Sequence, residues 1–233
     1  MAPVPDFPDV PLDTAHFVIT INRDFGSLGR PIARRLAELL GVEFYDRDIV
    51  EATAERLHQP ISVISDAEEQ KASGFFRMLF PLGRDTAPHQ KTLFETQSAF
   101  IQQVASRESC IIVGRCADYV LRDHPNAMNV FIYAPYADRL ANCVGPLKMD
   151  KRTAKKMIAG VDKARAAYHK YWAGYPARDP NHNHIIINSA LLEVEGTAQA
   201  LAAIARVRFH LTDGGKGGET DAAAEAPAAP ASV

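Results

Sequence analysis

Short apolar runs alternate along the chain with longer stretches in which apolar residues recur every three to four positions. Five of the runs are apolar almost throughout and rich in β-branched residues, which predicts strands buried on both faces of a parallel sheet. They span residues 17–21, 42–45, 110–113, 130–134 and 185–187. The alternation of strands with helical stretches predicts an α/β fold, a doubly wound three-layer sheet of about five parallel strands with right-handed crossovers.

The stretches between the strands show helical spacing. The first helix is expected to open at Pro31, with Ile32, Leu36, Leu39 and Leu40 along its apolar face. Further helices are predicted over residues 49–57, 91–108, 135–144, 150–172 and 191–209. The last helix should close the fold with an inward-facing row made of Val194, Ala198, Leu201 and Ile204.

The folded part is expected to be a single domain over residues 15–210. Residues 1–14 read as a flexible, proline-rich lead-in, and residues 211–233 contain Gly, Ala, Pro and Glu with almost no bulky apolar residue. Such a tail cannot bury enough apolar surface to offset the entropy lost on ordering, so we expect it to be disordered.

Composition narrows the classes of function. The 233 residues carry a formal net charge of -2, which gives no argument for binding nucleic acid. No apolar run approaches the length of a membrane span, and the N-terminus lacks the features of a secretory signal. The three cysteines show no C-x-x-C spacing, which favours a reducing compartment over a disulfide scaffold. We therefore expect a cytoplasmic protein that binds neither nucleic acid nor membrane, and its oligomeric state is left open.

A loop with two glycines, Gly26 and Gly29, joins the first predicted strand to the first helix. Strand, glycine-rich loop and helix together turn backbone N–H groups and a helix N-terminus toward an anion, usually phosphate. Compared with the phosphate-loop pattern G-x-x-x-x-G-K-[ST], Asp24 replaces the first glycine, Arg30 the lysine and Pro31 the hydroxyl residue. The alternative is a tight turn that binds no ligand.

The two substitutions at the end of the loop have different consequences. Arg30 keeps the positive charge and can grip two phosphate oxygens, although its shape differs from that of lysine. Pro31 opens a helix well but removes one N–H group. No metal ligand remains at this position unless Ser27 supplies one.

Charged residues follow two further strands, at the sheet edge where open α/β sheets bind ligands. Asp46 ends the second predicted strand, and Gly114 and Arg115 follow the third. An arginine at this edge is suited to an anionic ligand. The alternatives are a plain helix cap near Asp48 and an ion pair between Arg115 and a neighbouring carboxylate.

A run of cations covers the helix predicted over residues 150–172. Its members are Lys151, Arg152, Lys155, Lys156, Lys163, Arg165 and Lys170. Such a run is usually a solvated helix face, and its alternative role is a mobile lid that closes over phosphates. His182 and His184 have no nearby thiols or carboxylates at a standard ligand spacing, so no metal site in the protein is expected.

Five ordered stretches resemble the cytidylate kinase-like branch of the P-loop nucleoside monophosphate (NMP) kinases. They are residues 19–30, 44–46, 112–119, 162–165 and 187–189, and they span nearly all of the folded part. The resemblance implies a P-loop NMP-kinase-like fold, with a helical NMP-binding insertion at about 51–90 and a lid region at about 145–180.

The resemblance also implies roles for individual residues. The donor phosphates of ATP would be bound by Gly26, Ser27, Leu28, Gly29 and Arg30. The acceptor nucleotide would be bound by Asp46, Gly114, Arg115, Asp162 and Arg165. Arg30, Arg115 and Arg165 would act in catalysis, and Arg139 and Arg152 are the lid candidates. Mg²⁺ would enter with ATP, with no metal site of the protein's own.

The chain also departs from the cytidylate kinases. Arg47 stands where they have a serine and Cys116 where they have an aspartate, while Leu28 stands where cytidylate kinase-like relatives usually have another glycine. The leading hypothesis is therefore a kinase that transfers the γ-phosphoryl group of ATP to CMP, dCMP or a related acceptor. The alternatives are a catalytically silent nucleotide-binding or regulatory module on the same fold, and a scaffold that assembles through the aromatic segment at 75–80.

Overall fold

Five parallel strands form one sheet in the order β2-β3-β1-β4-β5. A computed structural model describes residues 16–46 and 87–211 of the chain. The strands are β1 (Val18–Arg23), β2 (Glu43–Tyr45), β3 (Cys110–Val113), β4 (Ala127–Tyr133) and β5 (Ile185–Asn188). Each coincides with one of the apolar runs, so the prediction of a five-stranded parallel sheet is confirmed.

The order of the strands places a crevice beside β1. β1 pairs with β3 on one side and with β4 on the other, and Ile21 lies opposite both Val113 and Val130. The chain first fills the β2–β3 side of the sheet and then crosses to β4 and β5, so the winding reverses next to β1. In open α/β sheets, ligands bind outside the carboxyl ends of the strands at this reversal.

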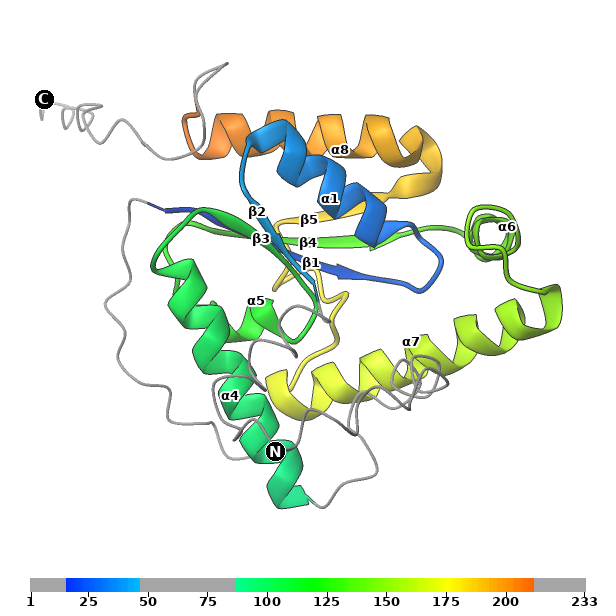
Figure 1. Ribbon diagram of the computed structural model, residues 1–233, viewed down its shortest axis with the longest axis horizontal. Helices are drawn as coiled ribbons and strands as arrows, with labels where there is room; N and C mark the ends of the chain where they lie inside the picture. Colours follow the sequence, from blue (N-terminus) through cyan, green and yellow to red (C-terminus); the bar gives the residue numbers. More distant parts are fainter. Residues whose placement is uncertain (1–15, 47–86, 212–233) are drawn as a thin grey trace, which may run out of the picture.

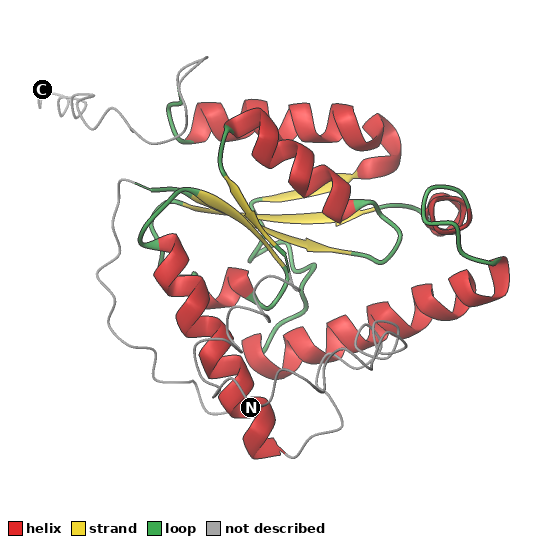
Figure 2. Cartoon of the chain, viewed as in Figure 1, coloured by secondary structure: helices red, strands yellow, loops and turns green. Residues whose placement is uncertain are grey.

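Helices cover both faces of the sheet (Figure 1). Helices α1 (Gly29–Leu40) and α8 (Ser189–Arg208) lie on one face, and α4 (Ala87–Ala105), α5 (Ala117–Val120) and α7 (Lys151–Ala173) lie on the other. Helix α6 (Tyr136–Val144) lies beyond the carboxyl ends of the strands and packs against α7. Figure 2 shows the resulting helix–sheet–helix layering, which confirms the predicted three-layer architecture.

Two apolar clusters join these layers. On the α1 and α8 side, Ile19 and Ile21 pack with Leu36 and Leu201, and all four are fully buried. On the other side, Ile112 packs in a cluster that includes the stacked rings of Phe94 and Trp172. Burying one such side chain contributes about 1.5–3 kcal/mol. Alternating residues of β3 therefore pack into opposite clusters, which is why its four residues are all apolar.

The structure differs from the predicted elements in four places. β4 begins at Ala127, earlier than predicted, and α4 spans Ala87–Ala105 rather than 91–108. The short helix α5 was not predicted. The prediction that Ile204 faces inward is wrong, because its side chain is 42% exposed. The buried stripe of α8 runs instead through Ala198, Leu201, Ala202 and Ala205, and Ile204 lies beside it.

Several predictions fall outside the described residues. These are the lead-in (1–14), the helix at 49–57, the aromatic segment at 75–80 and the tail from 212 onward. The insertion expected at about 51–90 overlaps the described part only at 87–90, which begin α4. Among the described helices, none combines the length and the apolar character needed to cross a bilayer.

Candidate functional site

The loop from Asp24 to Leu28 connects the end of β1 to the start of α1, at the crevice beside β1. Gly26 has a φ of 80°, and a Cβ atom there would lie 2.8 Å from the carbonyl oxygen of Arg139 and 3.0 Å from Sγ of Cys143. Only glycine fits so close to α6. Leu28 is also left-handed, with a φ of 58°, a conformation that glycine adopts more readily than leucine.

Side chains from α6, α7 and α8 hold the carbonyl groups of this loop. Arg165 donates to the backbone oxygen of Arg23 (3.2 Å), and Arg139 donates to that of Phe25 (3.3 Å). Asn142 donates to the backbone oxygen of Gly26 (2.9 Å), and Ser189 donates to that of Ser27 (2.8 Å). Within residues 16–46 and 87–211, the N–H groups of Gly26, Leu28 and Gly29 have no hydrogen-bond partner. The carbonyl groups of the loop are hydrogen-bonded to the helices, and its N–H groups lie at a helix N-terminus. Because N–H groups in this position attract negative charge, the loop is suited to bind an anion.

One turn of α7 braces this loop. Asp162 accepts a hydrogen bond of 2.7 Å from the N–H of Phe25 and forms an ion pair with Arg139. Arg165, three residues further along α7, holds the carbonyl of Arg23. The D-x-x-R pair assigned to the acceptor nucleotide thus contacts the loop backbone on both sides of Asp24, while Arg165 also lines the adjoining cavity.

The carboxyl group of Asp24 lies in a crowded environment. Burial raises its pKa, and the nearby Asp162 carboxylate adds to that shift, whereas Arg139, Arg178 and Arg165 oppose it. Asp24 stands where the usual phosphate loop has its first glycine, and it lines the cavity. An acid beside an anion site is tolerated because these arginines surround it.

Arg30 and Asp46, chosen from the sequence for separate roles, form an ion pair with each other. The Arg30 side chain is 52% exposed, while that of Asp46 is only 4% exposed. The pairing follows from the fold, because α1 begins and β2 ends at the same edge of the sheet. The guanidinium group of Arg30 is therefore directed to the end of β2 instead of being held over the loop.

Arg115 reaches the cavity from a strained turn. Gly114, Arg115 and Cys116 have φ values of 80°, 60° and 53°, which makes three successive left-handed residues at the end of β3. Such strain persists only where the surrounding structure enforces it, and it is typical of functional sites. The Arg115 side chain is buried, and its guanidinium carbon lies 5.7 Å from the centre of the Tyr168 ring on α7.

Cys116, next in that turn, is a buried core residue. Burial raises the pKa of its thiol well above the usual range, with a further contribution from Asp118, and Arg115 opposes the shift. A buried thiol with a raised pKa has little thiolate character, so the structure gives Cys116 a packing role.

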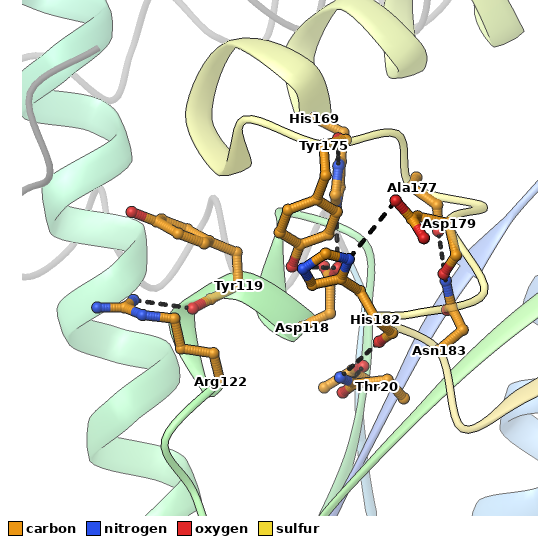
Figure 3. A network of polar contacts seen from close by, with 11 residues as sticks. Thr20, Asp118, Tyr119, Arg122, His169, Tyr175, Ala177, Asp179, His182 and Asn183 are labelled. Atoms are coloured by element: carbon orange, nitrogen blue, oxygen red, sulfur yellow. Dashed lines mark hydrogen bonds and ion pairs between the residues drawn. The ribbon is translucent and has the colours of Figure 1, made fainter. Parts of the chain in front are cut away.

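A buried polar network links α5 to the end of α7 (Figure 3). His169 and Tyr175 both point at Asp118, with His169 Nε2 at 2.8 Å and the Tyr175 hydroxyl at 3.3 Å from its Oδ2. His169 Nδ1 lies 2.9 Å from the carbonyl oxygen of Tyr175. Because both ring nitrogens face acceptors, the arrangement suits a protonated imidazolium paired with a carboxylate.

The pKa shifts in this network agree with that assignment. Burial by itself would raise the pKa of Asp118, but the hydrogen bond and charge of His169, together with Asn22 and Tyr175, hold it below its usual range. Burial would lower the pKa of His169, yet the Asp118 carboxylate and the Tyr175 carbonyl raise it. The network therefore holds a buried ion pair.

The loop, Arg115 and α7 enclose a cavity of about 1040 Å³ at the carboxyl edge of the sheet. Its described lining includes seven arginines: Arg23, Arg30, Arg34, Arg35, Arg115, Arg165 and Arg178. Four carboxylates, Asp24, Glu38, Asp46 and Asp162, also line it. Arg35 is bound to Glu38 and Glu195 outside the loop, and Arg178 lies 4.1 Å from the centre of the Tyr133 ring. The excess of arginines suits an anionic ligand of nucleotide size.

The two lid candidates differ in position. Arg139 is largely buried and bound to Asp162, where it supports the loop. Arg152 is exposed near the start of α7 and is not among the described residues that line the cavity. Most of the other cations on α7 are likewise exposed, so the solvated-face interpretation describes this helix except at Arg165.

The hydroxyl-bearing positions of the usual phosphate loop supply no metal ligand here. The Ser27 hydroxyl is fully buried and donates to the carbonyl oxygens of Asp24 (2.9 Å) and Ile132 (3.2 Å). Pro31 has no hydroxyl at the position that would hold Mg²⁺ in the usual loop. Across the described ranges there is no group of three or more His, Cys, Asp and Glu side chains that could hold a metal ion.

The sequence reasoning missed Arg23, Arg178 and the His169–Asp118 pair. Ile19, Ile21 and Arg23 are each two residues apart along β1, so they lie on the same face of the strand. That face is covered by α1, and Arg23 comes directly before the loop. His169 lies four residues after Arg165 on α7, so helical spacing places it on the same face. Arg178 lies in an irregular segment between α7 and β5, where no periodic signal exists.

Comparison with known proteins gives one family. A model of the cytidylate kinase-like family matches residues 18–191, which covers the phosphate-loop region, the strained turn, α7 and β5. A search of curated protein sequences gives no match.

Solved structures with a similar fold include an uncharacterized protein from Eubacterium ventriosum ATCC 27560, with 23% identity and a TM-score of 0.62. That match covers 82% of this chain and 98% of the other. A shikimate kinase from Bacteroides thetaiotaomicron matches with 16% identity and a TM-score of 0.46, over 81% of this chain and 97% of the other. A gluconokinase from Sinorhizobium meliloti 1021 matches with 15% identity and a TM-score of 0.45, over 85% of this chain and 97% of the other. At these identities the likeness concerns the fold alone.

Proposed function

The chain belongs to the cytidylate kinase-like family, and from this premise we propose that it transfers the γ-phosphoryl group of ATP to a nucleoside monophosphate, with CMP or dCMP as the first candidates. The fold implied by the family, a five-stranded parallel sheet of the P-loop kinase type, is the fold described above. The acceptor and the transfer itself belong to the proposal.

One arrangement carries the proposal. The loop that offers unused N–H groups and the strained turn that presents Arg115 follow the adjacent strands β1 and β3, and both open into one cavity. A donor phosphate on the loop and an acceptor phosphate on Arg115 would thus meet in the same space. Holding two reactants in this way supplies most of what phosphoryl transfer requires of a protein.

On the donor side, the N–H groups of Gly26, Leu28 and Gly29 would receive the β-phosphate. The carbonyl groups of the loop are already bound to α6, α7 and α8, so little reorganisation is needed when the nucleotide arrives. Asp162 and Arg165 would keep this loop in shape by their bonds to Phe25 and Arg23.

On the acceptor side, Arg115 would hold the phosphate of the monophosphate, and Arg165 and Arg178 would face the transferring group. An oxygen of the acceptor phosphate would bond to the γ-phosphorus while the bond from that phosphorus to the β–γ bridging oxygen breaks. The products would be ADP and a nucleoside diphosphate. Arginines around the cavity would stabilise the negative charge on the transferred group.

Asp46, paired with Arg30, would lie at the acceptor end of the cavity and orient the nucleoside. In this proposal Arg30 acts together with Asp46, and the pair presents one charged unit to the acceptor. Mg²⁺ carried in with ATP would neutralise part of the negative charge of the donor phosphates. With the Ser27 hydroxyl bonded to backbone carbonyls, the described residues fit a metal that arrives with the nucleotide.

A catalytically silent nucleotide-binding module is the second candidate, and one observation favours it. The residue at the lysine position, Arg30, is engaged by Asp46, and Pro31 supplies no metal-side hydroxyl. Such a module would bind ATP without turnover.

A coupled assay separates the two candidates. The purified protein, ATP and Mg²⁺ are combined with a panel of nucleoside monophosphates, and ADP formation is followed. We expect acceptor-dependent ADP formation with CMP or dCMP, reduced about 100-fold or more in Arg115→Ala because a charge-assisted phosphate contact is lost. ATP binding without ADP formation for any acceptor would support the silent module instead.

Arg208→Gln is the matched control for that assay. Arg208 lies at the end of α8 and donates to the carbonyl of Ala127, at the start of β4 and the opposite edge of the sheet. The substitution removes one arginine charge at a residue that does not line the described cavity, so turnover should stay within about twofold of wild type. Equal losses in Arg115→Ala and Arg208→Gln would contradict the role given to Arg115.

A further inference from the structure

The Arg23 side chain lies between the first residue of α1, Gly29, and the turn that carries Arg115. A Cβ atom added to Gly29 would lie 2.8 Å from Cβ and 2.9 Å from Cγ of Arg23, so the stem of this side chain crosses the first residue of α1. A Cβ atom added to Gly114 would lie 2.5 Å from Nη1 of Arg23, so the guanidinium group ends beside the turn that carries Arg115. Arg23 therefore spans the space between the loop and Arg115.

Glycine is needed at both ends of this path. At Gly29 the added atom would meet the base of the Arg23 side chain, which cannot swing away as its tip could. At Gly114 it would meet the guanidinium group itself. A larger residue at either position would collide with the Arg23 side chain, so both glycines are needed for its present path.

The backbone of Arg23 is also fixed from outside the loop. Its carbonyl accepts from Arg165 on α7, and the following residues are held by the bonds from Phe25 to Asp162 and from Asp24 to Ile132. A side chain on so well supported a backbone can be held in one orientation with little further loss of entropy. Arg30, in contrast, is the second residue of α1, and its half-exposed side chain is bound to Asp46.

We propose that Arg23 is the cation of the phosphate loop, performing the task that the missing lysine performs in the usual pattern. The inference rests on the proposed function, because it assigns a residue to the polyphosphate of that site. Arg23 binds the terminal phosphates of the donor from the side of β1, between the loop N–H groups and Arg115. Its planar group can bind two phosphate oxygens at once. Arg30 serves the acceptor end through Asp46.

Equilibrium binding of a fluorescent ATP analogue, 2′/3′-N-methylanthraniloyl-ATP, to the full chain tests this assignment. We expect Arg23→Gln to weaken binding about tenfold or more, and Arg23→Lys to weaken it less because the charge remains. Arg30→Gln should weaken binding less than about threefold, and Arg208→Gln should match wild type. If Arg23→Gln binds within about twofold of wild type, or if Arg30→Gln loses as much as Arg23→Gln, the assignment is overturned.

A second substitution guards against a folding defect in the Arg23 variants. Gly29→Ala keeps the charge of Arg23. Because the added atom would lie 2.8 Å from Cβ of Arg23, the start of α1 and the end of β1 must shift relative to each other, which displaces the Arg23 side chain. We expect Gly29→Ala to weaken binding about fivefold or more, with little further loss in the Gly29→Ala/Arg23→Gln double variant. Full additivity of the two losses would overturn the proposal, because the substitutions would then act independently.

Turnover in the same samples separates this inference from the proposed function. ATP binding that depends on Arg23, without transfer to any acceptor, would overturn the kinase proposal and keep Arg23 as the loop cation. Transfer that survives in Arg23→Gln would keep the kinase and overturn the assignment of Arg23. Wild-type protein that binds no ATP analogue would overturn both.

Discussion

The buried ion pair of His169 and Asp118 shows how much a single contact can determine. Both side chains are almost completely buried, and each compensates the burial of the other. Asp118 belongs to α5, which directly follows the turn that presents Arg115, and His169 belongs to the last turns of α7. The pair therefore holds α7 against α5 and the turn that presents Arg115.

The pH dependence of stability should report this pair. The raised pKa of His169 means that its contribution is complete below its ordinary value of 6.5 and is lost as the pH rises through the folded-state pKa. The lowered pKa of Asp118 means that its contribution is complete above 3.8 and is lost as the pH falls through the folded-state pKa. Urea unfolding of the wild type should thus show stability falling as the pH rises above 6.5, the ordinary pKa of histidine.

His169→Ala removes one partner of the pair and checks this assignment. It should cost about 3–5 kcal/mol near pH 6, because it leaves the Asp118 carboxylate buried without its cation, and the fall in stability above pH 6.5 should largely disappear. His210→Ala, at an exposed histidine, is the control and should keep the wild-type profile. Equal pH slopes in wild type and His169→Ala would show that the pair does not titrate as described.

At the scale of single residues, the sequence predicts at which edge of the sheet a side chain lies better than it predicts which side chain it contacts. Arg115 could be identified because it follows a buried strand and a glycine, and this local signal places it at the ligand edge. The pairing of Arg30 with Asp46 could not, because it depends on two elements returning to the same edge. The face on which Arg23 lies could be predicted from the two-residue period of β1. Its close approach to Gly29 and Gly114 could not, because it depends on how the elements pack.

Helix α7 is the element that joins the parts of the site. It braces the loop through Asp162 and Arg165, packs Tyr168 near Arg115 and ends with His169 on Asp118. These residues recur at spacings of three and four along one helix face. The element predicted as a lid or a solvated face therefore has one face in contact with the site and an opposite face that carries the exposed cations.

Asp162→Ala tests the brace. The substitution removes the acceptor of the Phe25 N–H group and the partner of Arg139, so it should lower stability by about 1–3 kcal/mol and weaken ATP binding about threefold to tenfold. Thermal unfolding and binding of the fluorescent analogue measure the two effects. Lys163→Ala, at the next and exposed position, should change neither. Tighter binding in Asp162→Ala would mean that the carboxylate mainly repels the nucleotide.

Elements were predictable where periodicity was strong. All five strands and most helices follow from apolar spacing, because tertiary burial and local pattern agree in the centre of the sheet. The face of α8 was mispredicted at Ile204, since positions three and four residues after Leu201 both fit helical spacing and Ala205 is the one that is buried. Helix α5 is too short, at four residues, to produce a periodic signal.

At the scale of the whole molecule, the site follows from the winding of the sheet. The strand order β2-β3-β1-β4-β5 brings the ends of β1 and β3 together and leaves the crevice between the loop and α7. The doubly wound class could be predicted from the sequence, because strands and helices alternate. The convergence of Arg23, Arg115, Arg165 and Arg178 on one cavity depends on the crossovers, which local sequence does not encode.

The central claim is that this cavity transfers a phosphoryl group between two nucleotides. A single-turnover experiment with [γ-³²P]ATP, Mg²⁺, a candidate monophosphate and the protein in excess tests it most directly, because even slow chemistry is then detected. The account predicts that the label moves from ATP into the nucleoside diphosphate, and that Arg115→Ala abolishes this movement. Label that stays in ATP, or that appears only as inorganic phosphate, would contradict the account.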